Sequence, residues 1–305
     1  MPRHMHTHPN TGRWIALSMV VVVLAALAVG VLRFAAGTTT PAGTSATPAP
    51  TAAGTAPAGT APARTTTAAG AAGATQAPAS SAPSGAPLDP RTGRHSTLGG
   101  LVPDYALPPI EDGMVPVITR IPTQQRVVFL TIDDGAVKRA SDLALLERNG
   151  VKASLFLAHT FIAGHADFYQ SYLDAGYLIE DHTMTHNLGF IKLPYAQVKA
   201  EICGMADYEQ MYFGRRPVLF RPPGGPYTMA VRRAAAECGM KAIVDWEAKA
   251  NARSMQYQVG EALRPGDIVL MHFRPEFPAD LAAFIKAQKA AGLKVVLLED
   301  YLGVT

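Results

Sequence analysis

The chain has 305 residues and a formal net charge of +3, and this charge is distributed unevenly along the sequence. Residues 1–96 contain six arginines, no lysine and one acidic residue, so they carry a net charge of +5, whereas the remainder carries −2. Nucleic-acid-binding domains usually present a basic face with aromatic side chains among the charges, so this distribution argues against a nucleic-acid partner. The length is sufficient for one large domain or two small ones.

An uncharged apolar run extends from Trp14 to Leu32, and its 19 residues are just enough to cross the hydrocarbon core of a membrane. Arg3 and Arg13 precede the run and Arg33 follows it. The positive-inside tendency then predicts a cytoplasmic stub at residues 1–13 and places the rest of the chain outside. A cleaved signal peptide is the alternative, since residues 34–37 weakly resemble a cleavage site. We expect a single-pass membrane anchor, and a secreted protein if this segment is cleaved.

Residues 37–96 consist almost entirely of Thr, Ala, Pro, Gly and Ser. Such a segment buries too little large apolar surface to offset the entropy lost on ordering, so we expect a disordered linker. Its prolines favour extended conformations that would hold a domain away from the membrane. We expect residues 97–305 to form the folded catalytic domain.

The two cysteines of the chain, Cys203 and Cys238, are too few for a disulfide scaffold and lack the spacing of a paired-thiol metal site. Each falls in a predicted helix beside the core, so they could form a disulfide in an oxidising compartment. Two buried free thiols are the alternative, because the sequence does not determine the distance between the two residues.

Short apolar runs alternate with amphipathic stretches from about residue 98 onward. The predicted strands are 127–132, 153–157, 177–179, 218–220, 241–244, 268–271 and 295–298. The predicted helices include 139–148, 195–212, 229–239 and 279–291. This alternation favours an α/β fold of parallel strands and crossover helices, either a barrel or a doubly wound sheet. Both folds gather their active sites at the carboxyl ends of the strands.

Two polar clusters follow predicted strands and suggest a metal site. Asp133 and Asp134 lie in the sequence TIDDG, and adjacent carboxylates repel each other unless a cation or an arginine neutralises them. The sequence HTMTH separates His182 and His186 by four residues, so that on one helical turn or on a tight loop both could bind one ion. With Asp134 they form a set that suits Zn²⁺ or another first-row divalent ion. A routine Asp-Gly turn and incidental histidines are the alternative.

Two further clusters could supply the rest of an active site. In FRPPGGPY (residues 220–227), prolines and glycines favour an irregular backbone that can aim N–H groups at a developing oxyanion, and Arg221 can pair with the carboxylate that the metal does not use. The apolar strand IVLMH ends at His272, which is a candidate general acid. A plain helix-entry loop and a structural histidine are the alternatives.

Taken in order, TIDDG, HTMTH, RPPGG and LMH resemble the motifs of the NodB-homology polysaccharide deacetylases, the fourth carbohydrate esterase family. The resemblance covers about residues 110–303. It implies a distorted (β/α) barrel of about seven strands and a metal-dependent hydrolase that removes N-acetyl groups from a glycan. The metal would be a divalent ion, most simply Zn²⁺, with Co²⁺ or another first-row ion as alternatives.

The resemblance also assigns a role to each residue that matches a motif. Asp133 would be the catalytic base, Arg221 would orient it, and His272 would be the catalytic acid. The backbone N–H of Gly224, where the family usually has Tyr, would help to hold the oxyanion, and Leu270 would contact the acetyl methyl group. The metal ligands would be Asp134, His182 and His186.

One motif departs from the family pattern. The family usually has an Asp-Trp pair after a strand, and this Asp tunes the acid histidine. Asp245 and Trp246 are the candidates here, but counting forward from Arg221 puts them on the strand itself, whereas counting back from His272 makes them the expected pair. Asp245 is therefore a candidate acid-tuning residue, and Trp246 a candidate substrate contact. His159, which follows the second predicted strand, is more simply a structural histidine.

We expect this protein to hydrolyse N-acetyl groups of a cell-wall glycan, most simply the GlcNAc or MurNAc of peptidoglycan, because the anchor and the linker would place the domain there. Two alternatives use the same fold. One is a catalytically silent glycan-binding module, which the departure at Asp245 favours, and the other is an O-acetyl esterase.

Overall fold

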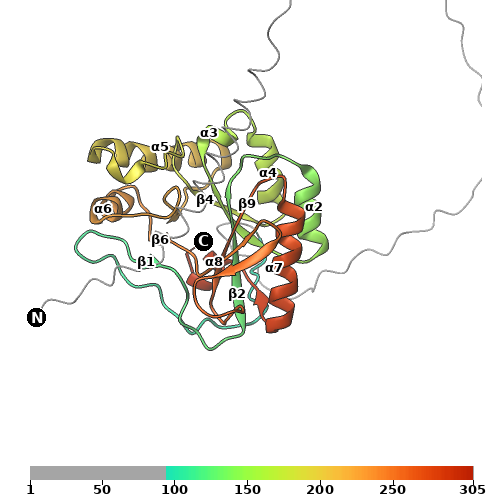
Figure 1. Ribbon diagram of the computed structural model, residues 1–305. Helices are drawn as coiled ribbons and strands as arrows, with labels where there is room; N and C mark the ends of the chain where they lie inside the picture. The colour runs from blue at the N-terminus through green and yellow to red at the C-terminus, as the bar shows by residue number, and fades with distance from the viewer. Residues whose placement is uncertain (1–93, 305) are drawn as a thin grey trace, which may run out of the picture. The chain divides into compact units, whose positions relative to one another are not determined.

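The computed structural model describes residues 94–304 (Figure 1). The predicted stub, the predicted anchor at residues 14–32 and nearly all of the predicted linker lie outside these described residues. Within residues 94–304, none of the helices combines the length and the apolar character that a membrane crossing requires. At the start of the described part, the side chain of Arg94 pairs with Asp300, and the backbone N–H of Thr97 donates to the same carboxylate over 2.6 Å.

A curved sheet forms the centre of this domain. Its strands are β1 (Val117–Ile118), β2 (Val127–Asp134), β3 (Ala153–Leu157), β4 (Leu178–Asp181), β5 (Leu219–Phe220), β6 (Ala242–Val244), β7 (Ala248–Asn251), β8 (Ser254–Tyr257), β9 (Ile268–His272) and β10 (Lys294–Val295). They follow the order β1-β6-β5-β4-β3-β2-β9-β7-β8, and β10 pairs with the start of β2. Neighbouring strands are parallel except for the β7–β8 hairpin. The predicted α/β architecture is confirmed as a half-barrel.

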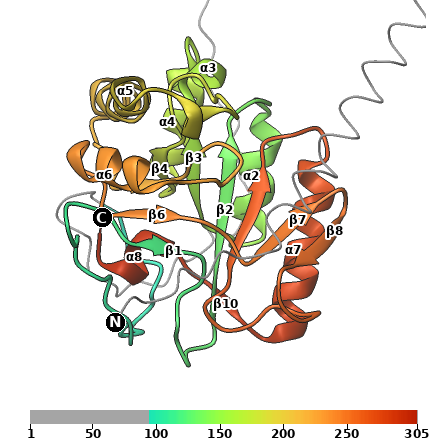
Figure 2. The same ribbon diagram turned by 60° about the vertical axis from the view of Figure 1, so that its left-hand side comes forward.

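Helices pack around this sheet in two groups, which both views show (Figures 1 and 2). The helices are α2 (Ala140–Arg148), α3 (His159–Ile162), α4 (Ala166–Asp174), the 3₁₀ helix η1 (Phe190–Lys192), α5 (Tyr195–Phe213), α6 (Met229–Glu237), α7 (Phe277–Ala291) and α8 (Leu298–Leu302). Helices α5 and α6 lie side by side on one flank, whereas α2 and α7 lie together on the other. A disulfide between Cys203 of α5 and Cys238 at the end of α6 joins the first pair.

Strand β2 is buried along its whole length and divides its side chains between two apolar cores. Since successive side chains of a strand point to opposite faces, Val128 and Leu130 pack with the core that includes residues of α4 and α7. Val127 and Phe129 pack instead with the core that includes Tyr301 of α8. Burial on both faces is typical of parallel strands covered on each side, and explains the nearly continuous apolar run in the sequence.

The number of strands is larger than the sequence pattern predicts. Within residues 94–304, nine strands lie along the main path of the sheet, because β1, β7 and β8 contain no long apolar run. The β7–β8 hairpin turns at Ala252 and Arg253, whose φ angles of 51° and 66° match the left-handed turn that suits the twist of a hairpin. The predicted strand at 295–298 is shorter, since β10 ends at Val295 and α8 begins at Leu298.

Candidate active site

Asp133 and Asp134 end strand β2, and a local break in the strand geometry directs both carboxylates toward one place. Neighbouring side chains on a regular strand would point to opposite faces. Asp134, however, has φ of 76°, and the N–H of Gly135 donates to the carbonyl of Asp133 over 3.1 Å, which closes a tight γ-turn. As a result, Asp133 Oδ2 and Asp134 Oδ1 each lie 3.7 Å from Nε2 of His182.

His182 and His186 are carried by a loop that follows β4, and not by a helix. Thr183 and His186 both have positive φ angles, of 75° and 53°, which non-glycine residues adopt rarely. Hydrogen bonds within the loop stabilise this conformation: Thr183 N–H donates to Asp181 Oδ1 over 2.8 Å, and His186 N–H donates to Thr183 Oγ1 over 3.1 Å. Strained backbone that is held in this way is common at functional sites.

The ring of His182 has a defined orientation. Its Nδ1 lies 2.6 Å from the carbonyl oxygen of Arg221, which can only accept a hydrogen bond, so Nδ1 carries the proton that it donates. The lone pair of neutral His182 is therefore on Nε2, which faces Asp134. A hydrogen bond from the far ring nitrogen to a carbonyl is the usual way in which a protein orients a metal-binding histidine.

Asp134, His182 and His186 together fit a divalent metal ion. One ligand atom from each residue lies within 4.8 Å of the other two. Asp134 Oδ1 is 3.1 Å from His186 Nε2 and 3.7 Å from His182 Nε2, whereas two ligands of tetrahedral zinc stand about 3.4 Å apart when each is roughly 2.1 Å from the metal. These three predicted ligands are thus brought together with nearly the separations that one ion requires.

The protonation equilibria of the same residues show that the cluster stabilises positive charge. Burial alone would raise the pKa of Asp134, but the neighbouring imidazoles of His182 and His186 bring this pKa well below its usual range. Burial alone would lower the pKa of His182, but Asp133 and Asp134 raise this pKa above its ordinary value. A cation placed among these three side chains, whether a proton or a metal ion, is therefore favoured.

Arg221 is fully buried and contacts the other carboxylate. Its Nη1 donates to Asp133 Oδ1 over 2.6 Å and to Thr131 Oγ1 over 2.8 Å, and its Nε donates to the carbonyl of Val244 over 2.9 Å. The guanidinium also lies over the ring of Phe156, 4.3 Å from its centroid. With Oδ1 held by Arg221, Asp133 presents Oδ2 toward His182 and the metal ligands.

His272 ends strand β9 and is the register partner of Asp133 in the sheet. Burial, together with the charges of Arg274 and Lys249, lowers the pKa of His272 to about 4, while the nearby Asp134 and Asp133 act in the opposite direction. Arg274 also approaches the metal cluster, since its Nη2 lies 3.8 Å from Asp134 Oδ2. In the metal-free protein His272 is consequently neutral at pH 7.

The predicted substrate contacts lie in two neighbouring segments. Gly224 and Gly225 follow β5 with φ of 73° and 97°, and a Cβ on Gly225 would stand 2.9 Å from the indole of Trp246, so this close approach requires glycine. Leu270 of β9 is the register partner of Thr131 of β2. It stands two residues before His272 and therefore lies on the same face of the strand as His272.

The carboxylate of Asp245 accepts a hydrogen bond from the N–H of Trp246 over 3.0 Å. A tuning role for Asp245 stays a prediction.

Sequence reasoning did not identify Thr131, Thr183, Lys249 or Arg274 as part of this site. Thr131 and Thr183 stand inside the TIDDG and HTMTH motifs, and Arg274 is two residues after His272, whereas Lys249 has no such signal. His159 was predicted as a structural residue, and its ring packs edge-on against Tyr208 with 4.7 Å between the centroids.

Comparisons with known proteins indicate the family of this chain. The family described as polysaccharide deacetylase matches residues 120–243. An uncharacterized protein of Streptomyces coelicolor is 38% identical over 196 residues, which cover 61% of this chain and 77% of that protein. The chain belongs to the polysaccharide deacetylase family. A peptidoglycan-N-acetylglucosamine deacetylase of Bacillus cereus is 26% identical over 200 residues, which cover 61% of this chain and 92% of that enzyme.

Solved structures share the fold of this polysaccharide deacetylase. A peptidoglycan N-acetylglucosamine deacetylase in complex with an N-hydroxybenzamide has a TM-score of 0.54 at 20% identity, covering 63% of this chain and 94% of that one. A pseudoenzyme of carbohydrate esterase family four from Bacillus anthracis has a TM-score of 0.52 at 21% identity, covering 61% and 69%. The same fold thus occurs with and without catalysis, so the reaction has to be argued from the site residues.

Proposed function

We propose that this chain hydrolyses N-acetyl groups of an extracytoplasmic glycan, most simply the GlcNAc or MurNAc of peptidoglycan, with a divalent ion, foremost Zn²⁺, held by Asp134, His182 and His186. The main support is that these three ligand atoms lie within 4.8 Å of one another, beside a second carboxylate that an arginine orients. The name of the Bacillus cereus relative supports a peptidoglycan substrate.

The proposed reaction divides the work among a few side chains. A bound divalent ion would lower the pKa of a coordinated water to about 7 and polarise the acetamido carbonyl. Asp133 Oδ2 accepts a proton from the attacking water while Arg221 holds Oδ1. The backbone N–H of Gly224 donates to the oxygen on which negative charge develops, and Leu270 contacts the acetyl methyl group.

Cleavage of the C–N bond requires a proton on the sugar nitrogen, because an amide anion is a very poor leaving group. His272 delivers this proton. Since its pKa of about 4 leaves it neutral at pH 7, His272 acquires the proton during the reaction. Asp133, its register partner, is the neighbouring carboxyl that has just accepted one from water. The products are acetate and a sugar with a free amine.

The extracytoplasmic location is part of the proposal. The apolar run at residues 14–32, with arginines before it, supports a membrane anchor, and the Thr/Ala/Pro-rich segment supports a spacer. The disulfide between Cys203 and Cys238 supports an oxidising compartment, since such bonds are rare in reducing cytoplasm.

Acetate release by the full-length chain tests the proposal on three substrates: peptidoglycan, chitooligosaccharides and O-acetylated oligosaccharides. We expect acetate from the N-acetylated substrates, loss of activity with a chelator and recovery with Zn²⁺. Asp133→Asn should lower kcat by about 10²–10⁴-fold, because general base catalysis contributes about that much. Asp207→Asn, which changes a largely exposed carboxylate paired with Arg216, is the matched control and should keep full activity.

The other outcomes separate the alternatives. Release from O-acetylated substrates alone would indicate an esterase. Because structural neighbours include a pseudoenzyme, binding of glycan without any acetate release would indicate a silent module. Full activity of Asp133→Asn would show that another residue is the base.

A further inference from the structure

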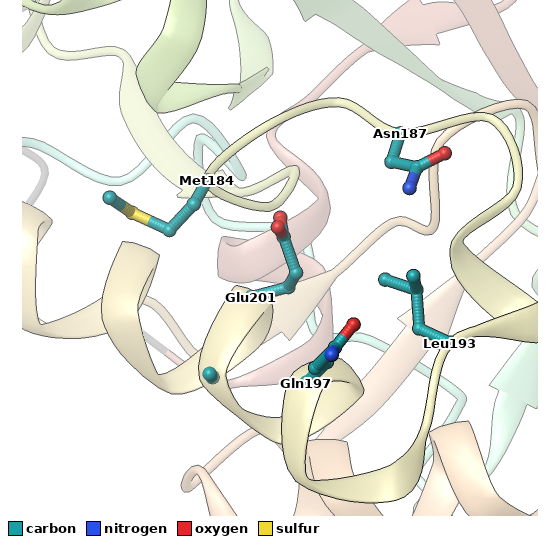
Figure 3. Close-up of a pocket in the computed structure, with 6 residues that line it drawn as sticks. Met184, Asn187, Leu193, Gln197 and Glu201 are labelled. Atoms are coloured by element: carbon teal, nitrogen blue, oxygen red, sulfur yellow. The ribbon is translucent and has the colours of Figure 1, made fainter.

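The loop that carries His182 and His186 is bonded to helix α5 through one side chain, Glu201. The carboxylate of Glu201 accepts two hydrogen bonds from Thr185, one from the backbone N–H over 2.8 Å and one from the hydroxyl over 2.7 Å. Its backbone carbonyl accepts a third, from the N–H of Met184 over 3.2 Å. Figure 3 shows the carboxylate of Glu201 directed at the loop segment that carries Met184.

Met184 of the loop packs against the apolar core, whereas the segment after it borders a cavity. A cavity of about 440 Å³ lies between the loop and α5, lined by Met184, Asn187, Leu193, Gln197, Ala200 and Glu201 (Figure 3). Beside this cavity, the hydrogen bonds from Glu201 join the loop to α5. They add to the hydrogen bonds within the loop in holding the positive φ angles of Thr183 and His186, which non-glycine residues adopt rarely.

Two other features keep Glu201 in place relative to the loop. Gly204, one turn further along α5, lies against Met184, and a Cβ at this position would stand 3.2 Å from Met184 Cγ. Glycine within a helix lowers stability by about 1 kcal/mol relative to alanine. The close contact with Met184 explains why a glycine occupies this position. The disulfide at Cys203, two residues from Glu201, fixes this turn of α5 to α6.

The restraint acts on the more weakly held of the two histidines. His182 is almost inaccessible to solvent and its ring is oriented by Arg221, whereas the side chain of His186 is 19% exposed. Because Thr185 directly precedes His186, holding the Thr185 N–H in place also holds the point at which the His186 side chain leaves the backbone. On the opposite side of the loop, the carbonyls of Thr183 and Met184 accept hydrogen bonds from the start of α3.

We propose that Glu201 is a positioning residue for the metal site, which holds the loop so that His186 is preorganised to bind the ion with Asp134 and His182. This inference rests on the proposed function, because it assumes that these three residues bind a metal. Outer partners that orient metal ligands typically contribute about 10–100-fold to metal affinity. We expect an effect of this size for removal of the Glu201 carboxylate.

The dissociation constant for Zn²⁺, measured on the full-length chain by competition with a chromophoric chelator, tests the proposal. Glu201→Ala should raise this constant about 10–100-fold and change the visible absorption spectrum of the Co²⁺-loaded protein, which reports ligand geometry. Glu201→Gln keeps an acceptor for the Thr185 N–H and should recover most of the affinity. Glu237→Ala removes a partly exposed carboxylate of α6 that pairs with Lys199 of α5, and this variant should bind Zn²⁺ like the wild type.

A second pair of variants covers the case in which Glu201→Ala does not fold. Thr185→Val removes the hydroxyl that donates to Glu201, whereas Thr185→Ser keeps it, so the valine variant should bind Zn²⁺ more weakly than the serine variant. Equal affinity of wild type and Glu201→Ala, or of the two Thr185 variants, would overturn the role of Glu201. A wild-type protein that binds neither Zn²⁺ nor Co²⁺ would overturn the metal site itself, and this result is seen without any variant.

Discussion

Asp133 and Asp134 are neighbours in the chain, yet they have different partners. Arg221 pairs with Asp133 and holds one of its oxygens, whereas two imidazoles surround Asp134. Two adjacent carboxylates with the same environment would repel each other and share a proton. With different partners, one of the two can bind a metal ion while the other accepts a proton from water.

At the residue scale, the low pKa of His272 can be tested directly. Arg274 is a cation that opposes protonation of this imidazole. Removing the cation makes protonation easier, so Arg274→Gln should raise the pKa of His272 above about 4. NMR titration of the imidazole resonances in metal-free protein measures this pKa. Arg253→Gln, at the turn of the β7–β8 hairpin, is the control, and an unchanged pKa in Arg274→Gln would show that its charge is screened by solvent.

At the scale of elements, the disulfide links α5 to the end of α6 and encloses a segment that contains β5 and the loop with Gly224 and Gly225. The segment between the two cysteines, which are 35 positions apart, therefore includes Arg221, which orients Asp133. The same bond lies next to Glu201, which holds the metal-binding loop. One covalent link thus restrains two segments that meet at the site.

This disulfide should contribute measurably to stability. A disulfide that closes a loop of this length restricts the unfolded chain, so the Cys203→Ser, Cys238→Ser double variant should lose about 2–4 kcal/mol of unfolding free energy. Denaturant titration of the oxidised protein, the reduced protein and the double variant measures the loss. The reduced protein should match the double variant. If oxidised and reduced proteins unfold at the same denaturant concentration, the bond does not restrain the chain.

At the scale of the whole domain, a buried polar network involves β3, β4 and α8. Glu299 of α8 is fully buried and accepts a hydrogen bond from Ser154 of β3 over 2.7 Å. Glu180 of β4 is also buried and pairs with Arg215 over 2.6 Å. Burial, together with the charge of Glu180, raises the pKa of Glu299 to about 8.

This raised pKa predicts how stability depends on pH. The folded protein holds a proton on Glu299 more tightly than the unfolded chain does, so its contribution is present at low pH and is lost as pH rises from about 4.5 to about 8. Glu299→Gln provides a neutral group of the same size and should therefore flatten this decline and be more stable than wild type above pH 8. Melting temperatures between pH 5 and pH 9 test this, with the exposed Glu261→Gln as control. Parallel curves for wild type and Glu299→Gln would contradict the assignment.

The local pattern of the sequence was sufficient to predict the α/β alternation and some of the aspartates and histidines that gather at the site. Strands such as β2 and β9 are apolar runs that end in a charged residue or a histidine, and parallel strands bring their carboxyl ends to one edge of a sheet. Asp134, His182 and His186 could therefore be grouped without coordinates. The predicted anchor and linker lie outside the described residues and stay predictions.

Tertiary structure decided the features that depend on distances between residues far apart in the chain. The two cysteines could be bonded or free until the packing of α5 against α6 brought their Cα atoms to 4.9 Å. Glu201 has no motif, and only the position of α5 beneath the loop relates it to His186. The left-handed conformation of Asp134 also depends on residues far along the chain, since its carbonyl accepts a hydrogen bond from the N–H of Ala158 after β3, and the carbonyl of Gly135 accepts one from the hydroxyl of Tyr169 on α4.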